Sequence, residues 1–180
     1  DTMQRSSDGT VKNAVRLHDD LIVESVLIPT KTRTTACVSS QVGCSLDCNF
    51  CATAQLKRMR NLSPDEIYDQ VVSIHKESLL HHQRPLSNIV FMGMGEPLAN
   101  YNRVMSALRT MIEPQPNGLG MSARNITVST VGLVPAIHKL AAEEIPVTFA
   151  LSLHAPDDKL RDELIPVNSR WKVDEALDAA

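Results

Sequence analysis

The chain has 180 residues, a length that suits a single domain with a hydrophobic core of its own. Apolar residues make up 43% of it and charged residues 22%, and the net charge of −3 does not indicate a nucleic-acid binder, because phosphate contacts need clustered Lys and Arg. No apolar run is long enough to span a membrane and the start is unlike a signal peptide, so we expect a cytoplasmic protein.

The first thirty residues predict a β-hairpin or a small meander. Residues 11–17 and 21–28 are the strand candidates, and the polar turn His18-Asp19-Asp20 joins them. From residue 31 onward, patterns typical of strands alternate with patterns typical of helices. We therefore expect an N-terminal β extension over residues 1–30 and a core over residues 31–180.

The core pattern consists of four strand–helix units. The first helix has a clear start signal, with Ser63 at the cap, Pro64 at the first helical position and Glu66 three residues after the serine. Such alternation predicts a parallel sheet with helices outside it. A final helical segment at 173–180 has no stop signal, so we expect a piece of a longer protein. The expected strands are 34–39, 88–92, 125–130 and 146–153, and the further helices are 101–112, 134–143 and 157–164.

Three cysteines, Cys44, Cys48 and Cys51, form a C-x3-C-x2-C motif in the loop after the first core strand. Structural zinc sites and conventional ferredoxin clusters use four ligands, and the only other cysteine, Cys37, lies in an expected strand. Three thiolates would leave one iron of a [4Fe–4S] cluster open to a substrate. Zinc and structural disulfides stay open as alternatives, although no secretion signal accompanies the cysteines.

Polar groups also follow the next three expected strands. Gly93-Met94-Gly95-Glu96-Pro97 follows the second strand, Ser129 lies at the end of the third, and Ser152-Leu153-His154 at the end of the fourth. Each has a simpler interpretation as a turn or a helix cap. Because the carboxyl ends of parallel strands share one edge, we expect these groups to form a cofactor pocket with the cysteine loop.

These motifs together resemble the radical S-adenosylmethionine superfamily and, within it, the dual-specificity RNA adenine-C2 methyltransferases. The resemblance rests on the cysteine motif and on the runs at 37–44, 60–62, 91–98, 129–132 and 152–156. It implies an α/β fold, a partial (βα)6-type radical SAM barrel truncated after about four βα units, which uses a [4Fe–4S] cluster and S-adenosyl-L-methionine. It also implies that the cofactor contacts are Gly95, Glu96, Ser129, Ser152, Leu153 and His154, and that the cluster ligands are Cys44, Cys48 and Cys51.

The implied activity is methylation of carbon 2 of adenosine in 23S rRNA and tRNA. A methyl group is first placed on a cysteine near the protein's C-terminus, and a 5′-deoxyadenosyl radical formed at the cluster then activates it. Cys37 matches the cysteine that resolves the RNA adduct through a transient disulfide bond, and Glu24 matches the proton acceptor. An electron donor such as flavodoxin and a monomeric state are also implied. Two alternatives remain: a sister enzyme that methylates carbon 8, and a non-catalytic iron–sulfur or zinc protein.

The chain departs from the family pattern at three places. No cysteine lies beyond Cys51, so the methyl-carrying cysteine is absent, and so is a later asparagine that contacts the cofactor. Lys57 stands where the family commonly has glycine. The first two departures fit a truncated chain, which also lacks the N-terminal accessory domain. We expect such a fragment to bind the cluster without completing methyl transfer.

Overall fold

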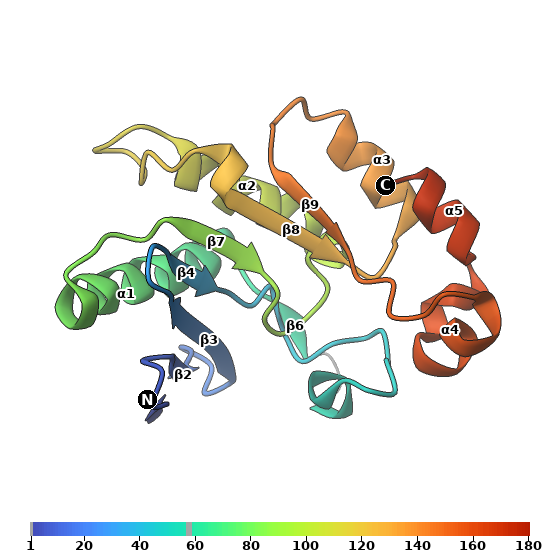
Figure 1. Ribbon diagram of the computed structural model, residues 1–180, viewed down its shortest axis with the longest axis horizontal. Coiled ribbons are helices and arrows are strands. Elements are labelled where there is room, and N and C mark those ends of the chain that lie inside the picture. Colours follow the sequence, from blue (N-terminus) through green and yellow to red (C-terminus); the bar gives the residue numbers. More distant parts are fainter. Residues whose placement is uncertain (1, 57–58) are drawn as a thin grey trace.

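The computed structural model describes residues 2–56 and 59–180 (Figure 1). The departure predicted at Lys57 lies outside the described residues. One seven-stranded sheet, in the order β1-β2-β3-β4-β7-β8-β9, forms the centre of the molecule. Its strands are β1 (Thr2–Arg5), β2 (Val11–Arg16), β3 (Ile22–Pro29), β4 (Thr34–Cys37), β7 (Asn88–Phe91), β8 (Ile126–Thr130) and β9 (Thr148–Leu151), and a separate ribbon pairs β5 (Gln41–Val42) with β6 (Arg60–Asn61).

The helices follow the strands in the predicted order. The four predicted strand–helix units are present as β4–α1, β7–α2, β8–α3 and β9–α4. No helix among the described residues is both long and apolar enough to cross a lipid bilayer. The α-helices are α1 (Pro64–His82), α2 (Tyr101–Ile112), α3 (Val134–Ala141), α4 (Asp158–Leu164) and α5 (Val173–Asp178), and the short 3-10 helices are η1 (Ala52–Leu56), η2 (Pro97–Asn100), η3 (Ala123–Asn125) and η4 (Pro166–Ser169).

The sheet changes character at β4. The strands from β1 to β4 pair antiparallel, whereas β4, β7, β8 and β9 pair parallel. The predicted α/β fold, with a parallel arrangement of the four core strands, is therefore confirmed, and so is the predicted hairpin, to which β1 adds a third strand. Because β3 pairs directly with β4, the N-terminal strands continue the same sheet. The division of the chain near residue 30 stays a prediction.

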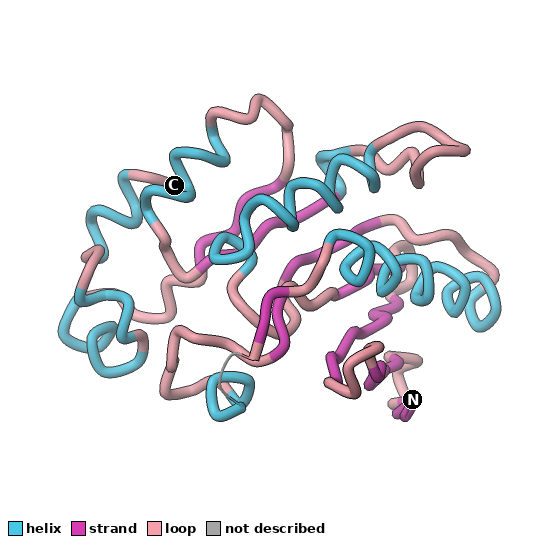
Figure 2. The backbone as a smooth tube through the Cα atoms, turned by 180° about the vertical axis from the view of Figure 1, so that it is seen from behind, coloured by secondary structure: helices cyan, strands magenta, loops and turns pink. Residues whose placement is uncertain are grey.

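One face of this sheet is packed against helices and the other is open. The strand side chains that face the helices are almost fully buried, as at Val23, Ala36 and Val128, which are each 0% exposed. The alternate positions, among them Val26 and Cys37, are only half-buried. Figure 1 shows β7 and β8 uncovered on the near side, and the view from behind in Figure 2 shows helices lying across the strands. The open face is therefore available to form a pocket.

The start of α1 forms as its sequence signal predicts. The Glu66 backbone N–H donates to Ser63 Oγ at 3.2 Å, and the Ser63 N–H donates to Glu66 Oε2 at 2.9 Å. These two bonds satisfy backbone donors that a helix start otherwise leaves open.

Several element boundaries differ from the prediction by one or two residues. The first core strand ends at Cys37 instead of residue 39, and β9 covers only 148–151 of the predicted 146–153. α3 ends at Ala141, two residues before the predicted end. After β9, residues 152–154 leave the ladder and line the cavity described below.

Candidate active site

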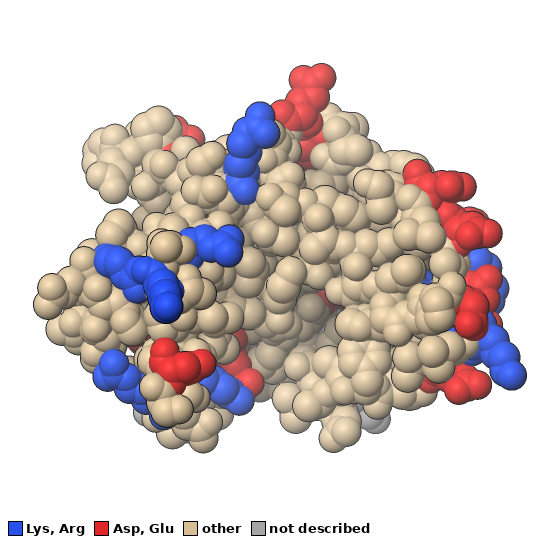
Figure 3. Space-filling view, viewed as in Figure 1, with Lys and Arg blue, Asp and Glu red and all other residues tan. Residues whose placement is uncertain are grey.

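A cavity of about 610 Å³ opens at the carboxyl ends of β7, β8 and β9. The space-filling view shows this face of the molecule hollowed in its middle (Figure 3). Every residue predicted to bind the cluster or the cofactor lines the cavity. These residues are Cys44, Cys48, Cys51, Gly95, Glu96, Ser129, Ser152, Leu153 and His154. The structure thus brings the predicted pocket together, while the ligand assigned to each residue stays a prediction.

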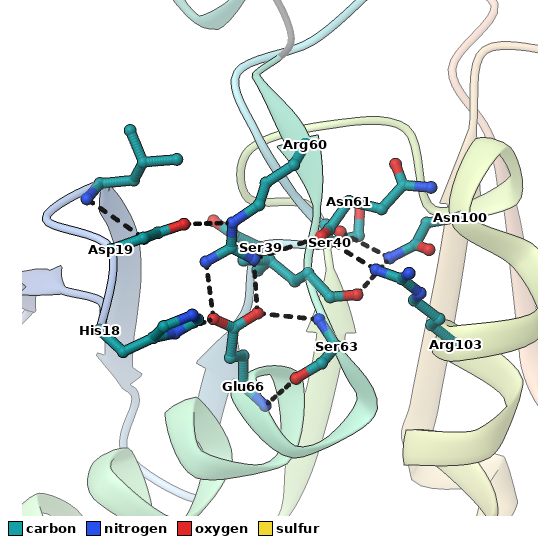
Figure 4. Close-up of polar contacts among 12 residues, drawn as sticks. His18, Asp19, Ser39, Ser40, Arg60, Asn61, Ser63, Glu66, Asn100 and Arg103 are labelled. Carbon is teal, nitrogen blue, oxygen red and sulfur yellow. Dashed lines mark hydrogen bonds and ion pairs between the residues drawn. The ribbon is translucent and has the colours of Figure 1, made fainter.

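The cysteine loop begins and ends at the β5–β6 ribbon, which the sequence analysis did not predict. The Met59 N–H donates to the Val42 carbonyl at 2.8 Å, and this bond closes the base of the loop. Figure 4 shows Arg60, at the end of the loop, between Asp19 and Glu66. Its guanidinium donates to both Glu66 oxygens at 2.7 and 2.8 Å and to Asp19 at 2.5 Å. The loop is therefore anchored to the start of α1 and to the N-terminal hairpin.

The three cysteines of the loop are free thiols that face the same cavity. Burial raises the pKa of the Cys44 thiol, and it raises the pKa of Cys48 to about 11, with neighbouring Cys44 and Cys51 adding to the effect. Thiolates are therefore unfavourable in this pocket unless positive charge is bound there. Iron or zinc would supply that charge, since a coordinating thiol loses its proton.

Three free thiols that line one cavity suit a cluster in which each thiolate binds a separate iron. Within residues 2–56 and 59–180, no three Cys, His, Asp or Glu side chains converge on a position for one metal ion. In a [4Fe–4S] cluster each thiolate binds a different iron, so the sulfur atoms need not meet at one point as they do around zinc. The three cysteines therefore fit a cluster with three protein ligands.

Glu96 is a buried carboxylate in the wall of the cavity, only 4% exposed. Its Oε1 accepts from the Leu98 N–H at 2.9 Å and its Oε2 from the Val131 N–H at 3.1 Å. Burial nevertheless raises the pKa of Glu96 to about 7, since desolvation outweighs these bonds. An ammonium group in the cavity would favour the charged carboxylate, as an opposite charge does at close range.

The segment after β4 packs so closely on Gly93 and Gly95 that neither position has room for a side chain. A Cβ on Gly95, whose φ is +91°, would lie 2.5 Å from Gln41 Cβ, and one on Gly93 would lie 2.7 Å from Ser39 Oγ. The sequence analysis expected Gly95 to contact the cofactor. The structure shows close approach to the segment after β4, and this packing holds Glu96 next to the start of the cysteine loop.

The ends of β8 and β9 meet at a pair of hydroxyl groups. Ser129 Oγ and Ser152 Oγ lie 3.1 Å apart, and either one can donate to the other. Beyond them, His154 has a left-handed backbone with φ of +58°, and its ring packs against Phe50 with centroids 4.5 Å apart. Phe50 belongs to the cysteine loop, so this contact links the loop to the end of β9. The sequence analysis missed Phe50, although its place between Cys48 and Cys51 was a signal.

Cys37 and Glu24 are, among the described residues, the two predicted site residues that do not line the cavity. Both lie on the open face of the sheet, because Cys37 pairs in register with Val26, two residues along β3 from Glu24. The Cys37 thiol is close to the backbone of Met92, which does line the cavity, and burial raises the pKa of this thiol. Cys37 thus lies at the cavity margin, as a free thiol.

Glu24 lies outside the cavity that the cysteine loop lines. Its carboxylate forms an ion pair with Lys12 Nζ at 2.6 Å, and both side chains are about half exposed. It lines a small separate pocket near β1 and β2. The structure therefore does not bring Glu24 to the cavity, and its catalytic role stays a prediction.

Polar residues behind the cavity were missed by the sequence analysis. Gln41 accepts from the Glu96 N–H at 2.9 Å, and Asn100 Nδ2 donates to the carbonyls of Ser40 and Leu62 at 2.8 and 2.9 Å. Both lie in or next to conspicuous motifs, which was the available signal. Arg161 is also buried behind the cavity, and it had no such signal, since it resembles an exposed charge on a short helix.

The comparisons with known proteins agree with this geometry. A "Probable dual-specificity RNA methyltransferase RlmN" from Christiangramia forsetii is 63% identical over 179 residues, which is 99% of this chain and 50% of the relative. A protein with the same description from Salinispora tropica is 58% identical over 178 residues, 96% of this chain and 48% of the relative. The chain thus spans about half the length of these relatives.

The fold comparison covers almost the whole chain. The crystal structure of a radical SAM methyltransferase from Sphaerobacter thermophilus matches 99% of this chain and 52% of its own, with a TM-score of 0.94 and 44% identity. The sequence model of the Radical SAM superfamily matches residues 38–180, which contain the three cysteines and every strand end that lines the cavity. The chain therefore belongs to the radical SAM superfamily.

Proposed function

We propose that this chain is the core of a radical SAM RNA methyltransferase that methylates carbon 2 of adenosine in 23S rRNA and tRNA. One observation carries the proposal: a single cavity is lined by the three free cysteines and by the polar ends of β7, β8 and β9. The relatives described as dual-specificity RNA methyltransferases support the choice of RNA as the substrate. Since those relatives are twice as long, the complete reaction belongs to the whole protein.

Within this proposal, Cys44, Cys48 and Cys51 hold a [4Fe–4S] cluster whose fourth iron has no protein thiolate. When bound, the cluster and S-adenosyl-L-methionine supply the one-electron chemistry and the methyl group. Glu96 lies in the cavity wall, and burial raises its pKa to about 7. An ammonium group such as that of the methionyl part of the cofactor would stabilise the ionised carboxylate and bind to it.

The remaining wall residues orient the cofactor. Ser129 and Ser152 offer hydroxyl groups to its polar atoms, and Gly95 and Leu153 offer backbone groups. His154, which packs against Phe50, supplies an aromatic surface next to the cysteine loop. The mostly apolar wall of the cavity also limits the water around a reactive species.

Cys37 and Glu24 are proposed to act on the RNA side of the pocket. Cys37 lies on the open face next to Met92. There its sulfur can form a transient disulfide bond with a cysteine from outside this chain, as the bond between that cysteine's sulfur and the RNA-bound carbon breaks and the carbon takes the electron pair. Glu24 would serve as proton acceptor only after it leaves Lys12, with which it is paired. A flavodoxin-type electron donor, a monomeric state and a cytoplasmic location complete the proposal.

Anaerobic reconstitution with iron and sulfide tests the cluster assignment. We expect about four irons and four sulfides per chain, and an EPR signal of the reduced cluster that changes when S-adenosyl-L-methionine is added. The Cys48→Ala variant should lose this signal, whereas the matched control Cys37→Ala should retain it. Stoichiometric zinc without iron, or an EPR signal that the cofactor leaves unchanged, would contradict the proposal.

The position of methylation is tested with the whole protein. After reaction with 23S rRNA or tRNA and digestion of the RNA, mass spectrometry should locate the new methyl group on carbon 2 of adenosine. Methylation at carbon 8 would instead assign the protein to the sister enzyme, which shares the cysteine motif.

A further inference from the structure

Arg161 is a fully buried arginine in α4, directly behind the candidate active site, and it is 0% exposed. Arginine is rarely buried to this extent unless its charge and its N–H groups are satisfied. The acceptors that it uses here are uncharged: three backbone carbonyls and the side-chain oxygen of Asn168. Because the guanidinium donates only to neutral acceptors in these bonds, a simple ion pair does not account for its burial.

The guanidinium joins the two loops that carry the predicted cofactor contacts. Its Nε donates to the Leu153 carbonyl at 3.2 Å, and another of its nitrogens donates to the Val131 carbonyl. Val131 follows β8, where Ser129 lies, and Leu153 lies between Ser152 and His154 after β9. One side chain therefore bridges the backbone that follows β8 and the backbone that follows β9.

The Val131 residue connects Arg161 directly to Glu96. Its carbonyl accepts from Arg161, while its N–H donates to Glu96 Oε2 at 3.1 Å. The adjacent Gly132 leaves room for the guanidinium, because a Cβ on Gly132 would lie 3.3 Å from it. The backbone at Val131 and Gly132 therefore lies between Arg161 and Glu96 and packs closely against the guanidinium.

The other side of the guanidinium is held in place by Asn168. The Asn168 side-chain oxygen accepts from Arg161 at 2.5 Å, and its amide donates to Asp162 at 2.7 Å and to Asp158 at 3.0 Å. Asp158 and Asp162 thus bind Asn168, and Asn168 binds the guanidinium. The two carboxylates therefore fix the orientation of the arginine through Asn168 and not through an ion pair with it.

The same segment also packs against the cysteine loop. Ile165 and Val167 form an apolar cluster with Cys48, and the Asn49 N–H donates to the Leu164 carbonyl at 3.0 Å. A cluster with three thiolate ligands carries net negative charge, which a nearby buried cation would stabilise.

We propose that Arg161 is a positioning residue of the active site, which holds the loops after β8 and β9 in the arrangement that binds S-adenosyl-L-methionine and provides a fixed positive charge beside the cluster. This inference rests on the proposed function. It differs from a structural role in which Arg161 only attaches α4 to the sheet, because that role predicts an effect on stability alone.

Two variants separate the geometry of Arg161 from its charge. Arg161→Lys retains the charge but replaces a planar fork with a single ammonium group, which cannot reach both carbonyls in the same way. Arg161→Gln removes the charge as well. Arg84→Lys is the matched control, since Arg84 also donates to two backbone carbonyls, those of Thr30 and Lys31 at 2.9 and 3.0 Å, outside the cavity.

The experiment uses the reconstituted chain and three readouts: iron content, the midpoint potential of the cluster from an EPR redox titration, and the Kd for S-adenosyl-L-methionine from the change in the EPR signal. For Arg161→Lys we expect a Kd weakened by about tenfold or more at nearly unchanged potential. For Arg161→Gln we expect the same weakening together with a more negative potential, because net charge near a cluster sets its potential. Arg84→Lys should change neither quantity.

The outcomes distinguish this inference from the proposed function. A wild-type Kd and potential in either Arg161 variant that retains full iron content would overturn the positioning role. If neither variant takes up iron, Asn168→Ser decides by the same readouts, since it removes the orientation of Arg161 and should weaken the Kd to a smaller extent; an unchanged Kd would overturn the inference. Failure of the unaltered chain to take up iron would overturn the proposed function itself.

Discussion

At the scale of single residues, the cavity contains acidic side chains whose negatively charged forms are disfavoured by burial until a cationic ligand binds. Burial raises the pKa values of Glu96, Cys44 and Cys48, and neighbouring thiols raise those of Cys44 and Cys48 further. Arg161 has the opposite charge and lies behind them. A pocket that destabilises its own anions gains free energy when it binds cations such as iron and an ammonium group.

The raised pKa of Glu96 predicts a decrease in stability with increasing pH. Between the unfolded value of 4.5 and the folded value of about 7, the unfolded chain loses a proton that the folded chain retains. The stabilisation that this carboxyl contributes is therefore fully present below pH 4.5 and is lost as the pH rises through 7. From pH 5 to pH 7 this carboxyl alone should lower the free energy of unfolding of the cluster-free protein by about 2 kcal/mol.

Urea denaturation of the cluster-free protein at several pH values measures this decrease. The control is Glu96→Gln, which keeps an acceptor oxygen for one of the two backbone N–H groups and cannot titrate. The loss of stability from pH 5 to pH 7 should be about 2 kcal/mol larger in the unaltered protein than in the variant. Parallel pH profiles for the two proteins would show that Glu96 does not titrate in this range.

At the scale of elements, short local signals position the helix that supports the cysteine loop. α1 begins at Pro64 with a complete capping box formed by Ser63 and Glu66. Glu66 also binds Arg60, so the same carboxylate starts the helix and anchors the end of the loop. The apolar face of α1 then buries Ile67, Val71 and Ile74 at helical spacing.

Removal of the cap should destabilise the chain by a predictable amount. In Ser63→Ala the Glu66 N–H loses its acceptor, and we expect a loss of about 1 kcal/mol, which lowers Tm by about 2–4 °C for a domain of this size. Ser106→Ala, at an exposed position inside α2, is the matched control and should be neutral or slightly stabilising. Thermal unfolding followed by circular dichroism checks both, and equal Tm values would contradict the role of the cap.

At the scale of the whole molecule, one sheet joins the N-terminal strands to the parallel strands that carry the cavity. β3 pairs with β4, and Leu27 in β3 is 0% exposed in a hydrophobic core shared with Ile89 and Val128. A core that continues across residue 30 predicts that both parts unfold together.

Hydrogen exchange tests whether the chain unfolds as one unit. Leu27→Ala should cost about 2–5 kcal/mol, and amides in β8 should lose protection by the same free energy as those in β3. Ile28→Ala, on the open face of the same strand, should cost much less because Ile28 is 37% exposed. Loss of protection confined to β1, β2 and β3 would instead support a separate unit over residues 1–30.

The sequence by itself determined the local features: the cysteine motif, the cap of α1, the alternation of strands and helices, and the polar residues at each strand end. These depend on residues that are close in the chain, and parallel pairing brings strand ends to one edge whatever the details. Only the tertiary structure decided that Glu24 pairs with Lys12, that Gly95 packs on Gln41, and that Arg161 is buried. Each of these depends on contacts between separate segments, which local pattern and propensity do not specify.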